Sequence, residues 1–532
     1  MGAQTLGVLL DLVCFHIGKL AYRAGGGKGC AKLRPMIRST LAALVLIFPV
    51  AIAVADESPG LKPIDSFIEN AMKRWEVPGI AVAVLRDGEQ IYRRISGLRD
   101  VDRKLIVTPD TLFAVGSISK SFTVAGLAML VDEGRLDWDR PVREILPGFA
   151  LADPIATAHT TARDMVTHRT GLARHDMLWY GSGLNAEQLF TGLRHLAPGA
   201  PFRSGWQYNN LMFAASGRIA EAISDETWQE FTTRRLLAPL GMTASDFSPA
   251  ENDPRRAKPY EIDGEQIRRI PFYDMGAIAP AGAINSTIAD MLPYLAFHMQ
   301  NGVHAGGRLL SEAQAIAMQA RRVALGDTSP YAALGAPTYG MGFLISTYRG
   351  HRIIWHAGGV DGFVALLAFL PDAGIGMVAL SNLDRNPAPT ILTRNIFDRL
   401  LGLAPLPWND WVASDYLEWE FGQRQKAAQH ARSRDTTVRP SRPLADFTGA
   451  YRNPAYGVVR ISHEDESLML HYGQFALPLR PYKGDIFEIV KIPVTSRTHL
   501  EVSFHKNESG GIAGLTVPFE RAVADILFVR AE

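Results

Sequence analysis

The chain has 532 residues, of which 47% are hydrophobic and 20% are charged. This composition is typical of globular proteins with a sizeable core, and it excludes collagen-like, coiled-coil and wholly disordered chains. The 55 basic and 54 acidic residues leave a formal charge of +1, so the basic excess of a nucleic-acid-binding protein is missing. The composition favours a protein that handles a small-molecule or peptide-like substrate, with no nucleic acid as a partner.

The first segment, residues 1–55, is expected to be a leader that is removed. Residues 41–55 are uncharged and apolar, follow Arg38 and end in small residues, which is the layout of a secretory signal cleaved after Ala55. The run is shorter than the ~20 residues of a membrane span. Met36 is the expected true start, because it gives a signal peptide of normal length. The alternative is an uncleaved membrane anchor.

Cleavage would make the mature protein exported, periplasmic or secreted, with no stable membrane span. Both cysteines, Cys14 and Cys30, belong to the leader. The mature chain would therefore contain no disulfide, no thiol nucleophile and no cysteine metal ligand.

Residues 56–405 are expected to form one unit in which helical and strand patterns alternate. Helices are predicted over residues 64–75, 122–132 and 390–401, with several more between residues 161 and 298. Strands are predicted over residues 79–84, 90–96, 339–346, 351–356, 363–369 and 376–381.

The remainder of the chain has a different pattern. Residues 406–443 combine a polar helix, predicted over 408–431, with a charged linker that contains proline. Residues 444–532 consist of short alternating runs separated by glycine and proline, which predicts a small antiparallel β-barrel or sandwich. The runs are residues 458–461, 467–472, 475–479, 486–489, 500–504 and 514–517.

Metal and cofactor chemistry finds no support in the motifs. The chain has no H-E-x-x-H, no cysteine pair and no phosphate-binding P-loop. His159, His168 and His175 cluster without acidic neighbours at ligand spacing, which favours structural histidines. The G-x-S-x-G motif of α/β-hydrolases is also missing. We expect no metal site and no cofactor.

The sequence Ser117-Ile118-Ser119-Lys120 has the S-x-x-K form at a predicted helix start. This spacing places serine and lysine one turn apart on one helix face. The amine can then activate the hydroxyl, which a serine nucleophile requires. The Ser117 N–H is one of the unpaired donors of a helix N-terminus and is available to an oxyanion. The alternative is that Ser117 only caps the helix.

Two companion motifs occur in the expected order. They are Tyr208-Asn209-Asn210, which precedes a helix, and His356-Ala357-Gly358, which ends an apolar strand and is followed by Gly359. Tyr208 and His356 could also be half-buried packing residues, and Asn210 could be a helix cap. Each motif has decoys in poorer contexts, which begin at His16, His304, Tyr451, His471 and Ser503. Ser503 and Lys506 lie in a predicted strand, where they would point to opposite faces.

Residues 61–403 resemble the serine β-lactamase-related hydrolases, a group with class C β-lactamases, D,D-carboxypeptidases, D-aminopeptidases and family VIII esterases. The tail from Leu444 resembles the lipocalin-like β domain of some relatives. The stretches that carry the first resemblance are residues 111–123 (TLFAVGSISKSFT), 161–172 (TARDMVTHRTGL), 208–210, 239–242 (PLGM), 279–287 (APAGAINST) and 356–359.

The resemblance implies an α/β fold with an antiparallel sheet flanked by helices, an all-helical subdomain and a C-terminal β-barrel. It implies that Ser117 is the acylated nucleophile, with Lys120 as its proton partner and Tyr208 as general base and later acid. We expect the Lys120 ammonium to lower the pKa of Tyr208.

The remaining implied roles concern substrate binding. Asn210 would orient Lys120 or a substrate amide, and His356 and Gly358 would contact the substrate. The N–H groups of Ser117 and Gly359 would form the oxyanion hole.

The chain departs from many relatives at His356, where they carry lysine. A mostly neutral histidine should bind a substrate carboxylate more weakly. We therefore expect an exported serine hydrolase that cleaves an ester or an amide or peptide bond. The alternatives are a β-lactamase or D,D-carboxypeptidase, and a penicillin-binding protein that turns over slowly or not at all. The oligomeric state is left open.

Overall fold

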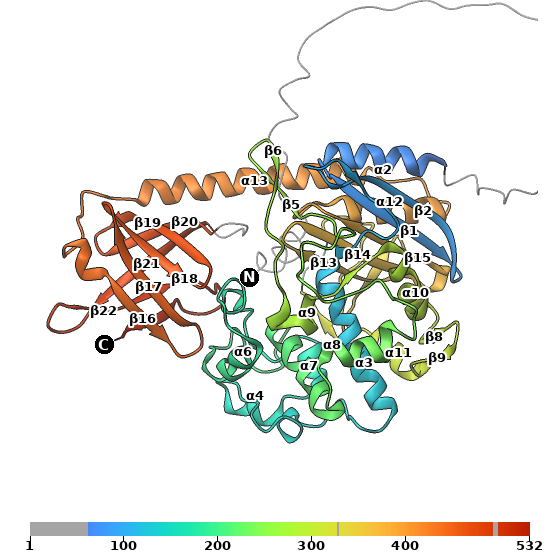
Figure 1. The fold of residues 1–532 in the computed structure, drawn as a ribbon, viewed down its shortest axis with the longest axis horizontal. Coiled ribbons are helices and arrows are strands. Elements are labelled where there is room, and N and C mark those ends of the chain that lie inside the picture. Colours follow the sequence, from blue (N-terminus) through green and yellow to red (C-terminus); the bar gives the residue numbers. More distant parts are fainter. Residues whose placement is uncertain (1–61, 327–328, 493–497, 532) are drawn as a thin grey trace, which may run out of the picture.

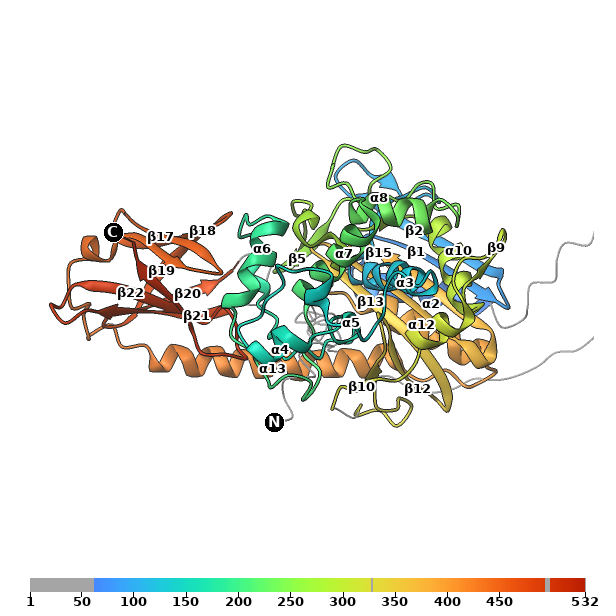
Figure 2. The same ribbon diagram turned by 90° about the horizontal axis from the view of Figure 1, so that it is seen from below.

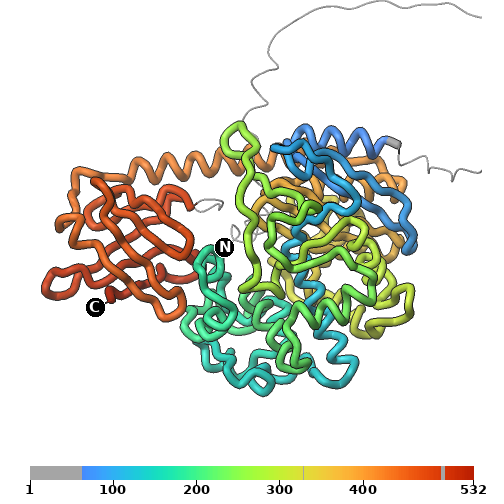
Figure 3. Tube along the Cα trace, in the orientation of Figure 1, coloured from blue at the N-terminus to red at the C-terminus, as the bar shows by residue number. Residues whose placement is uncertain are grey.

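The computed structural model describes residues 62–326, 329–492 and 498–531. The predicted leader, its cleavage after Ala55 and the start at Met36 lie outside these residues. Figure 1 shows two lobes joined by a long helix, and the tube in Figure 3 shows that the smaller lobe is built from the C-terminal part of the chain.

The larger lobe is built on a nine-stranded sheet in which neighbouring strands are antiparallel. Its strands, in spatial order, are β10 (Val323–Ala324), β11 (Thr338–Tyr339), β12 (Leu344–Tyr348), β13 (His351–Val360), β14 (Phe363–Leu370), β15 (Ile375–Ser381), β1 (Gly79–Arg86), β2 (Glu89–Asp100) and β3 (Leu105–Ile106).

Helices cover both faces of this sheet (Figure 1). On β1, Ile80 and Val82 join the apolar cluster that contains α2 (Lys62–Arg74) and α12 (Ala388–Leu400). The alternate residues Ala81 and Ala83 join a second cluster on the opposite face. That cluster contains α3 (Ser119–Asp132) and α10 (Ile288–Met299). Strand side chains alternate between faces, so the unbroken apolar sequence of β1 reflects burial on both sides.

The all-helical part lies beside the sheet and includes α3, which is buried along nearly its whole length. Figure 2 shows α4, α5 and α6 grouped on the side that faces the smaller lobe. The other helices are α4 (Pro154–His159), α5 (Ala162–Val166), α6 (Ala186–Gly192), α7 (Asn210–Ser224), α8 (Trp228–Thr232), α9 (Ala279–Gly282) and α11 (Glu312–Met318). The short pairs are β4 (Phe113–Ala114) with β7 (Asn285–Ser286), β5 (Tyr260–Asp263) with β6 (Gln266–Arg269), and β8 (Val303–His304) with β9 (Gly307–Arg308).

The smaller lobe is a closed antiparallel barrel of eight strands. Pairing of Tyr451 with Arg530 joins its first and last strands. The strands are β16 (Gly449–Asn453), β17 (Gly457–Glu464), β18 (Ser467–Tyr472), β19 (Phe475–Lys483), β20 (Ile486–Lys491), β21 (Thr498–Lys506), β22 (Ile512–Val517) and β23 (Ile526–Arg530). Helix α13 (Trp408–Ser433) connects the lobes.

The predicted fold class is confirmed: an α/β domain with an antiparallel sheet and helices is followed by an all-β barrel. The helix predicted over residues 408–431 is also present. Of the described helices, none has the length and apolar content required to span a membrane.

Three details of the predicted elements are wrong. The strand predicted over residues 339–346 is two strands, because Gly340 and Gly342 allow a tight turn between β11 and β12. The strand that contains His356 does not end there but continues to Val360. The first and last barrel strands, β16 and β23, lie outside the predicted runs and were missed.

Candidate active site

Ser117 lies in a 3-10 turn, Gly116–Ile118, that leads into α3. Gly116 has a φ of 53°, a left-handed conformation that glycine adopts without the strain of a Cβ. The Ser117 side chain makes no capping bond to α3, so the reading of Ser117 as a helix cap is wrong. The serine is half-buried, whereas both of its chain neighbours are buried.

Lys120 is fully buried on the first turn of α3. Its Nζ donates to Ser117 Oγ at 3.0 Å, to Asn210 Oδ1 at 2.7 Å and to the carbonyl oxygen of Ala281 at 2.8 Å. Burial lowers the pKa of Lys120 well below its usual value, and the guanidinium of Arg174 lowers it further. The neutral amine is therefore accessible as a proton acceptor for the serine.

Tyr208 comes from the loop that precedes α7, and its hydroxyl donates to Ser117 Oγ at 2.8 Å. Burial raises the pKa of Tyr208 to about 12, although the bond to Ser117 and the charge of Arg174 oppose that rise. The expectation that a lysine ammonium lowers this pKa is wrong, because desolvation of the buried phenol outweighs nearby positive charge. Tyr208 is thus a protonated donor at neutral pH.

Asn210 is the first residue of α7 and connects Lys120 to a carboxylate. Its Oδ1 accepts from Lys120, and its Nδ2 donates to Asp176 Oδ1 at 3.3 Å. The cap of α7 is Asn209, whose side chain accepts from the Met212 N–H. The alternative reading of Asn210 as the helix cap is therefore wrong.

Gly358 and Gly359 lie on β13 where this strand passes the Ser117 turn. A Cβ on Gly358 would lie 1.8 Å from the carbonyl oxygen of Val115 and 3.2 Å from the nitrogen of Ser117. A Cβ on Gly116 would lie 2.7 Å from the nitrogen of Gly359. Glycine is needed because the two main chains approach this closely.

The register of the β13–β14 hairpin determines where the Gly359 N–H points. Val360 pairs with Phe363 across a two-residue turn, and Gly359 pairs with Val364. Successive residues of an antiparallel strand direct their N–H groups to opposite sides. The Gly359 N–H therefore points away from β14 and towards the turn that carries Ser117.

His356 is 2% exposed and bonds to two neighbours. Its Nδ1 lies 2.7 Å from the carbonyl oxygen of Ala357, and its Nε2 lies 3.1 Å from the hydroxyl of Tyr339. Because a carbonyl only accepts, Nδ1 carries the proton and Nε2 accepts from Tyr339. Burial lowers the pKa of His356 to about 3. The ring is therefore neutral and supplies no positive charge for a substrate carboxylate.

Sequence analysis did not identify two charged residues at the site, Arg174 and Asp176. Arg174 lies with its guanidinium 4.9 Å from the ring centre of Tyr208 and bonds to Asp176 at 2.6 Å. Both lie in a loop without periodic pattern or motif, so no sequence signal marks them. His168, expected to be structural, packs its ring against Tyr208 and accepts from the Asn209 N–H.

The decoy motifs within the described residues lie away from this cluster. Ser503 and Lys506 are on β21 in the barrel, as predicted. The Tyr451 hydroxyl donates to the carbonyl oxygen of Phe447 inside the barrel, and His471 bonds to Ser462. His16 is outside the described part of the chain.

Among the described residues, one group of potential metal ligands occurs, between α13 and the barrel, although no metal site was expected. His430, Glu488 and His499 bring one ligand atom each within 4.8 Å of one another. Glu488 already accepts from His430 at 2.6 Å and from Arg480. These bonds join α13 to the barrel.

The comparisons with known proteins agree with this geometry. Residues 64–401 match the family model described as Beta-lactamase, and residues 433–530 match a domain of unknown function, DUF3471. The fold is that of the β-lactamase-like serine hydrolases. The chain belongs to the beta-lactamase family, and a barrel domain follows the family domain.

Two curated proteins illustrate the similarity. Unguisins hydrolase ungD' of Aspergillus campestris is 28% identical over 429 residues, which are 76% of this chain and 78% of that protein. Penicillin-binding protein 4 of Amycolatopsis lactamdurans is 29% identical over 332 residues, which are 61% of this chain and 85% of that protein.

Two solved structures share the fold at lower identity. The octameric penicillin-binding protein homologue from Pyrococcus abyssi has a TM-score of 0.57 and 21% identity, and the match covers 88% of this chain and 99% of that one. The D-amino acid amidase from Ochrobactrum anthropi has a TM-score of 0.54 and 21% identity, with 65% and 99% covered.

Proposed function

We propose that the protein is an exported serine hydrolase that cleaves an ester or amide bond through an acyl intermediate on Ser117. The single observation that carries this proposal is that Ser117 Oγ bonds to both Lys120 Nζ and the Tyr208 hydroxyl. A serine requires such an activating neighbour, because its own hydroxyl is a weak nucleophile.

The proposed reaction begins with neutral Lys120, which takes the proton of Ser117 as Oγ attacks the substrate carbonyl carbon. The oxyanion accepts hydrogen bonds from the N–H groups of Ser117 and Gly359. Tyr208 donates its proton to the leaving oxygen or nitrogen as that bond breaks, and the Lys120 ammonium returns a proton to the tyrosinate. Water then hydrolyses the acyl-serine with the same groups. Lys120 is thus the base, and Tyr208 acts as the acid.

The substrate class follows from the neutral His356. Relatives with lysine at this position can pair with a substrate carboxylate, whereas a histidine with a pKa of about 3 cannot. This favours esters and simple amides or peptides over β-lactams and D-Ala-D-Ala termini. A relative that is itself named a hydrolase agrees with turnover rather than with binding alone.

The test is intact-mass analysis after exposure to a fluorophosphonate, an aryl ester or a penicillin. Wild type should gain a stoichiometric fluorophosphonate adduct and hydrolyse the ester, whereas Ser117→Ala should do neither. Ser503→Ala, in the S-x-x-K decoy on β21, should behave as wild type. Labelling of Ser117→Ala would refute the proposal, and faster turnover of the penicillin than of the ester would replace its substrate class.

Export is proposed on the leader sequence alone, with cleavage after Ala55. N-terminal sequencing of the protein recovered from outside the cytoplasm should begin at Asp56. An intact leader on the recovered protein would favour the membrane anchor.

A further inference from the structure

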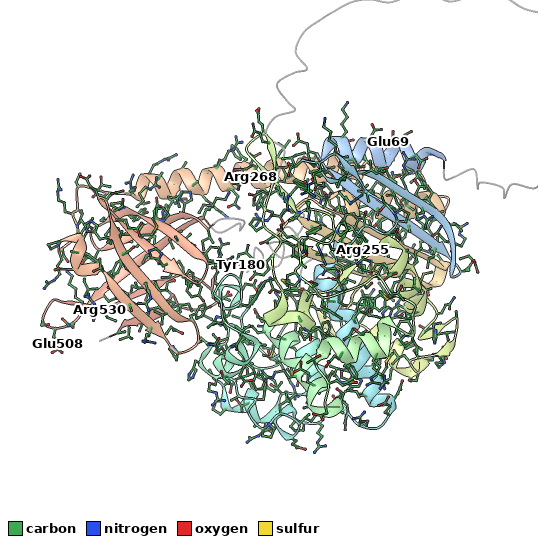
Figure 4. All side chains as sticks on the ribbon, in the orientation of Figure 1. Glu69, Tyr180, Arg255, Arg268, Glu508 and Arg530 are labelled. Atoms are coloured by element: carbon green, nitrogen blue, oxygen red, sulfur yellow. The ribbon has the colours of Figure 1, made fainter. Side chains whose placement is uncertain are left out.

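The barrel contacts one loop of the larger lobe, residues 174–181, which we call the site loop. The Tyr472 hydroxyl donates to the carbonyl oxygen of Met177 at 2.9 Å, and the Gln474 N–H donates to that of Gly181 at 2.8 Å. Figure 4 labels Tyr180 of this loop, which lies where the two lobes meet. The barrel therefore binds the site loop near both its middle and its end.

The two main chains are in close contact at the end of this loop. A Cβ on Gly473 would lie 1.9 Å from the carbonyl oxygen of Gly181, and the φ of Gly473 is 54°. Next to this contact, the Phe475 ring stacks on Tyr180 with a centroid distance of 5.9 Å. The fit leaves no room for a side chain at Gly473.

The start of the site loop is strained, and the barrel supports it. His175 has a φ of 46°, which a residue with a side chain rarely adopts. Its N–H donates to the buried carboxylate of Glu520 at 2.7 Å, and its Nδ1 lies 2.9 Å from the Tyr456 hydroxyl. Both partners belong to the barrel, so the barrel stabilises the strained conformation.

The other side of the site loop faces the reactive groups. Asp176 follows the strained residue directly and accepts from Asn210, which in turn holds Lys120. Arg174 precedes it and lies over the Tyr208 ring. Glu520 in the barrel is therefore connected to Lys120 in α3 through three residues, His175, Asp176 and Asn210.

We propose that the C-terminal barrel positions the catalytic centre by holding Arg174 and Asp176 against Tyr208 and Asn210. In this view Glu520 and Tyr472 are positioning residues that act through the site loop. The inference rests on the proposed function, and it gives the domain of unknown function a role in the chemistry of the preceding domain.

The inference has a signature in the pH dependence of acylation. The groups that face Lys120 are Tyr208 and His168, His356 on β13, and Arg174 and Asp176 on the site loop. The first three are neutral at neutral pH, because burial raises the pKa of the tyrosine and lowers the pKa of both histidines. Arg174 lowers the pKa of Lys120 more than Asp176 raises it. If the site loop moves away from the reactive groups, Arg174 and Asp176 both move away from Lys120. The pKa of Lys120 then rises.

The experiment compares a double variant of the full-length protein with a control variant. Tyr472→Phe combined with Glu520→Ala removes two barrel bonds to the site loop. Tyr451→Phe is the matched control, because its hydroxyl also donates to a carbonyl oxygen, that of Phe447, but within the barrel. The measurements are kcat and KM for an aryl ester, the fluorophosphonate labelling rate from about pH 6 to 10, and the Tm.

We expect the double variant to lose about 10- to 100-fold in kcat at neutral pH with little change in KM, since misplacing a reactive group by ~1 Å can cost up to about 10²-fold. Its labelling should recover at high pH, because the ascending limb of its profile moves upwards. Using Glu520→Gln instead of Glu520→Ala in the double variant keeps an acceptor for the His175 N–H and should restore most of the activity. Tyr451→Phe should lower the Tm but leave kcat, KM and the pH profile of labelling unchanged.

A double variant whose pH profile matches that of wild type or Tyr451→Phe would overturn the inference. Failure of the proposed function would look different, because Ser117→Ala would then retain labelling. If Ser117→Ala is inert and the double variant shows no shift, only the role of the barrel is refuted.

Discussion

At the scale of single residues, Lys120 combines two opposing influences. Its ammonium is satisfied by three oxygen acceptors, and it is also fully buried close to a guanidinium. The ammonium donates to all three oxygens, whereas the neutral amine donates to Asn210 and Ala281 and accepts from the Ser117 hydroxyl, so both forms are held in place. Burial lowers the pKa of the amine. A residue in this position can accept a proton and return it without moving, as the proposed reaction requires.

The first prediction replaces this amine. Lys120→Arg keeps a positive charge but loses the ability to become neutral, because arginine stays protonated in proteins. We expect fluorophosphonate labelling to slow by about 10²–10⁴-fold, the usual contribution of a proton-transfer group. Lys120→Met should lose as much. Lys506→Met, on the β21 decoy, serves as control, and a labelling rate above a tenth of wild type in Lys120→Arg would contradict the role of base.

Spacing predicted that Ser117 and Lys120 share one face of a helical turn, and the resemblance to the serine β-lactamase-related hydrolases added Tyr208, whose Y-x-N motif stands before a helix. The pKa of Tyr208 could not be predicted. It depends on burial by elements distant in the sequence, such as the loop with His168 and the strand with Tyr339. Asp176 was missed because an isolated carboxylate in a loop has no pattern.

At the scale of elements, the site depends on the contact of strand β13 with the turn before α3. The strand supplies the N–H of Gly359, and the turn supplies that of Ser117. Their separation is set by main-chain contact, since side chains are missing at both Gly116 and Gly358. A small displacement of the strand would therefore separate the two N–H groups of the proposed oxyanion hole.

The second prediction adds one carbon atom at this contact. Gly358→Ala places a Cβ 1.8 Å from the carbonyl oxygen of Val115, so β13 must move away from the turn. We expect labelling of Ser117 to fall by about 10²-fold, the cost of losing one oxyanion donor. Labelling and the circular dichroism spectrum should be measured together, because the fold should persist.

Gly422→Ala is the control for this substitution. Gly422 lies in α13 with no atom within 4 Å of its added Cβ. Alanine in a helix should stabilise the protein by up to about 1 kcal/mol and leave labelling unchanged. Wild-type labelling of Gly358→Ala would show that the oxyanion hole does not depend on this contact.

Elements with long apolar runs were predicted well, because strands β1, β14 and β15 are buried on both faces. The errors have a local cause. Gly342 has a φ of 79° and a Cβ there would meet Ser121 of α3 at 3.0 Å. A tertiary contact therefore requires a turn where the sequence looks like one strand. The extension of β13 beyond His356 was hidden by its two glycines, which usually end strands.

At the scale of the whole molecule, several ionisable groups are buried without charge. His298 is 1% exposed and neither ring nitrogen has a partner among the described residues. Burial lowers the pKa of both His298 and His356 to about 3, and that of His168 well below its usual value. The folded protein thus resists protonation at three histidines that the unfolded chain protonates freely.

The third prediction concerns acid stability. A lowered pKa in the folded state means that the unfolded state binds the proton first as the pH falls below ~6.5, so stability decreases from there towards about pH 3. Each such histidine contributes a slope of about 1.4 kcal/mol per pH unit. Urea unfolding of His298→Phe should show a shallower loss of stability between about pH 6 and 4.

The replacement suits its surroundings, since His298 packs against the rings of Tyr294, Phe297 and Phe343. His463→Phe on β17, where the ring is exposed, is the control and should keep the wild-type slope. An unchanged slope in His298→Phe would mean that this ring is already protonated in the folded state.

The overall architecture, an α/β domain followed by a barrel, could be predicted because the hydrophobic period changes near Leu444. The docking of the two lobes could not. It is made by single residues such as Glu520 and Tyr472, which resemble ordinary loop and strand residues until the fold brings them to the site loop.

Helix α13 has 26 residues, which corresponds to ~39 Å at 1.5 Å per residue. Its first turns are anchored by Trp408 on Tyr348, and its end by His430 on Glu488. Because each residue turns an α-helix by about 100°, one added or deleted residue between these anchors would rotate the barrel away from the loop that it supports. The number of residues between these anchors is therefore part of what sets the orientation of the barrel.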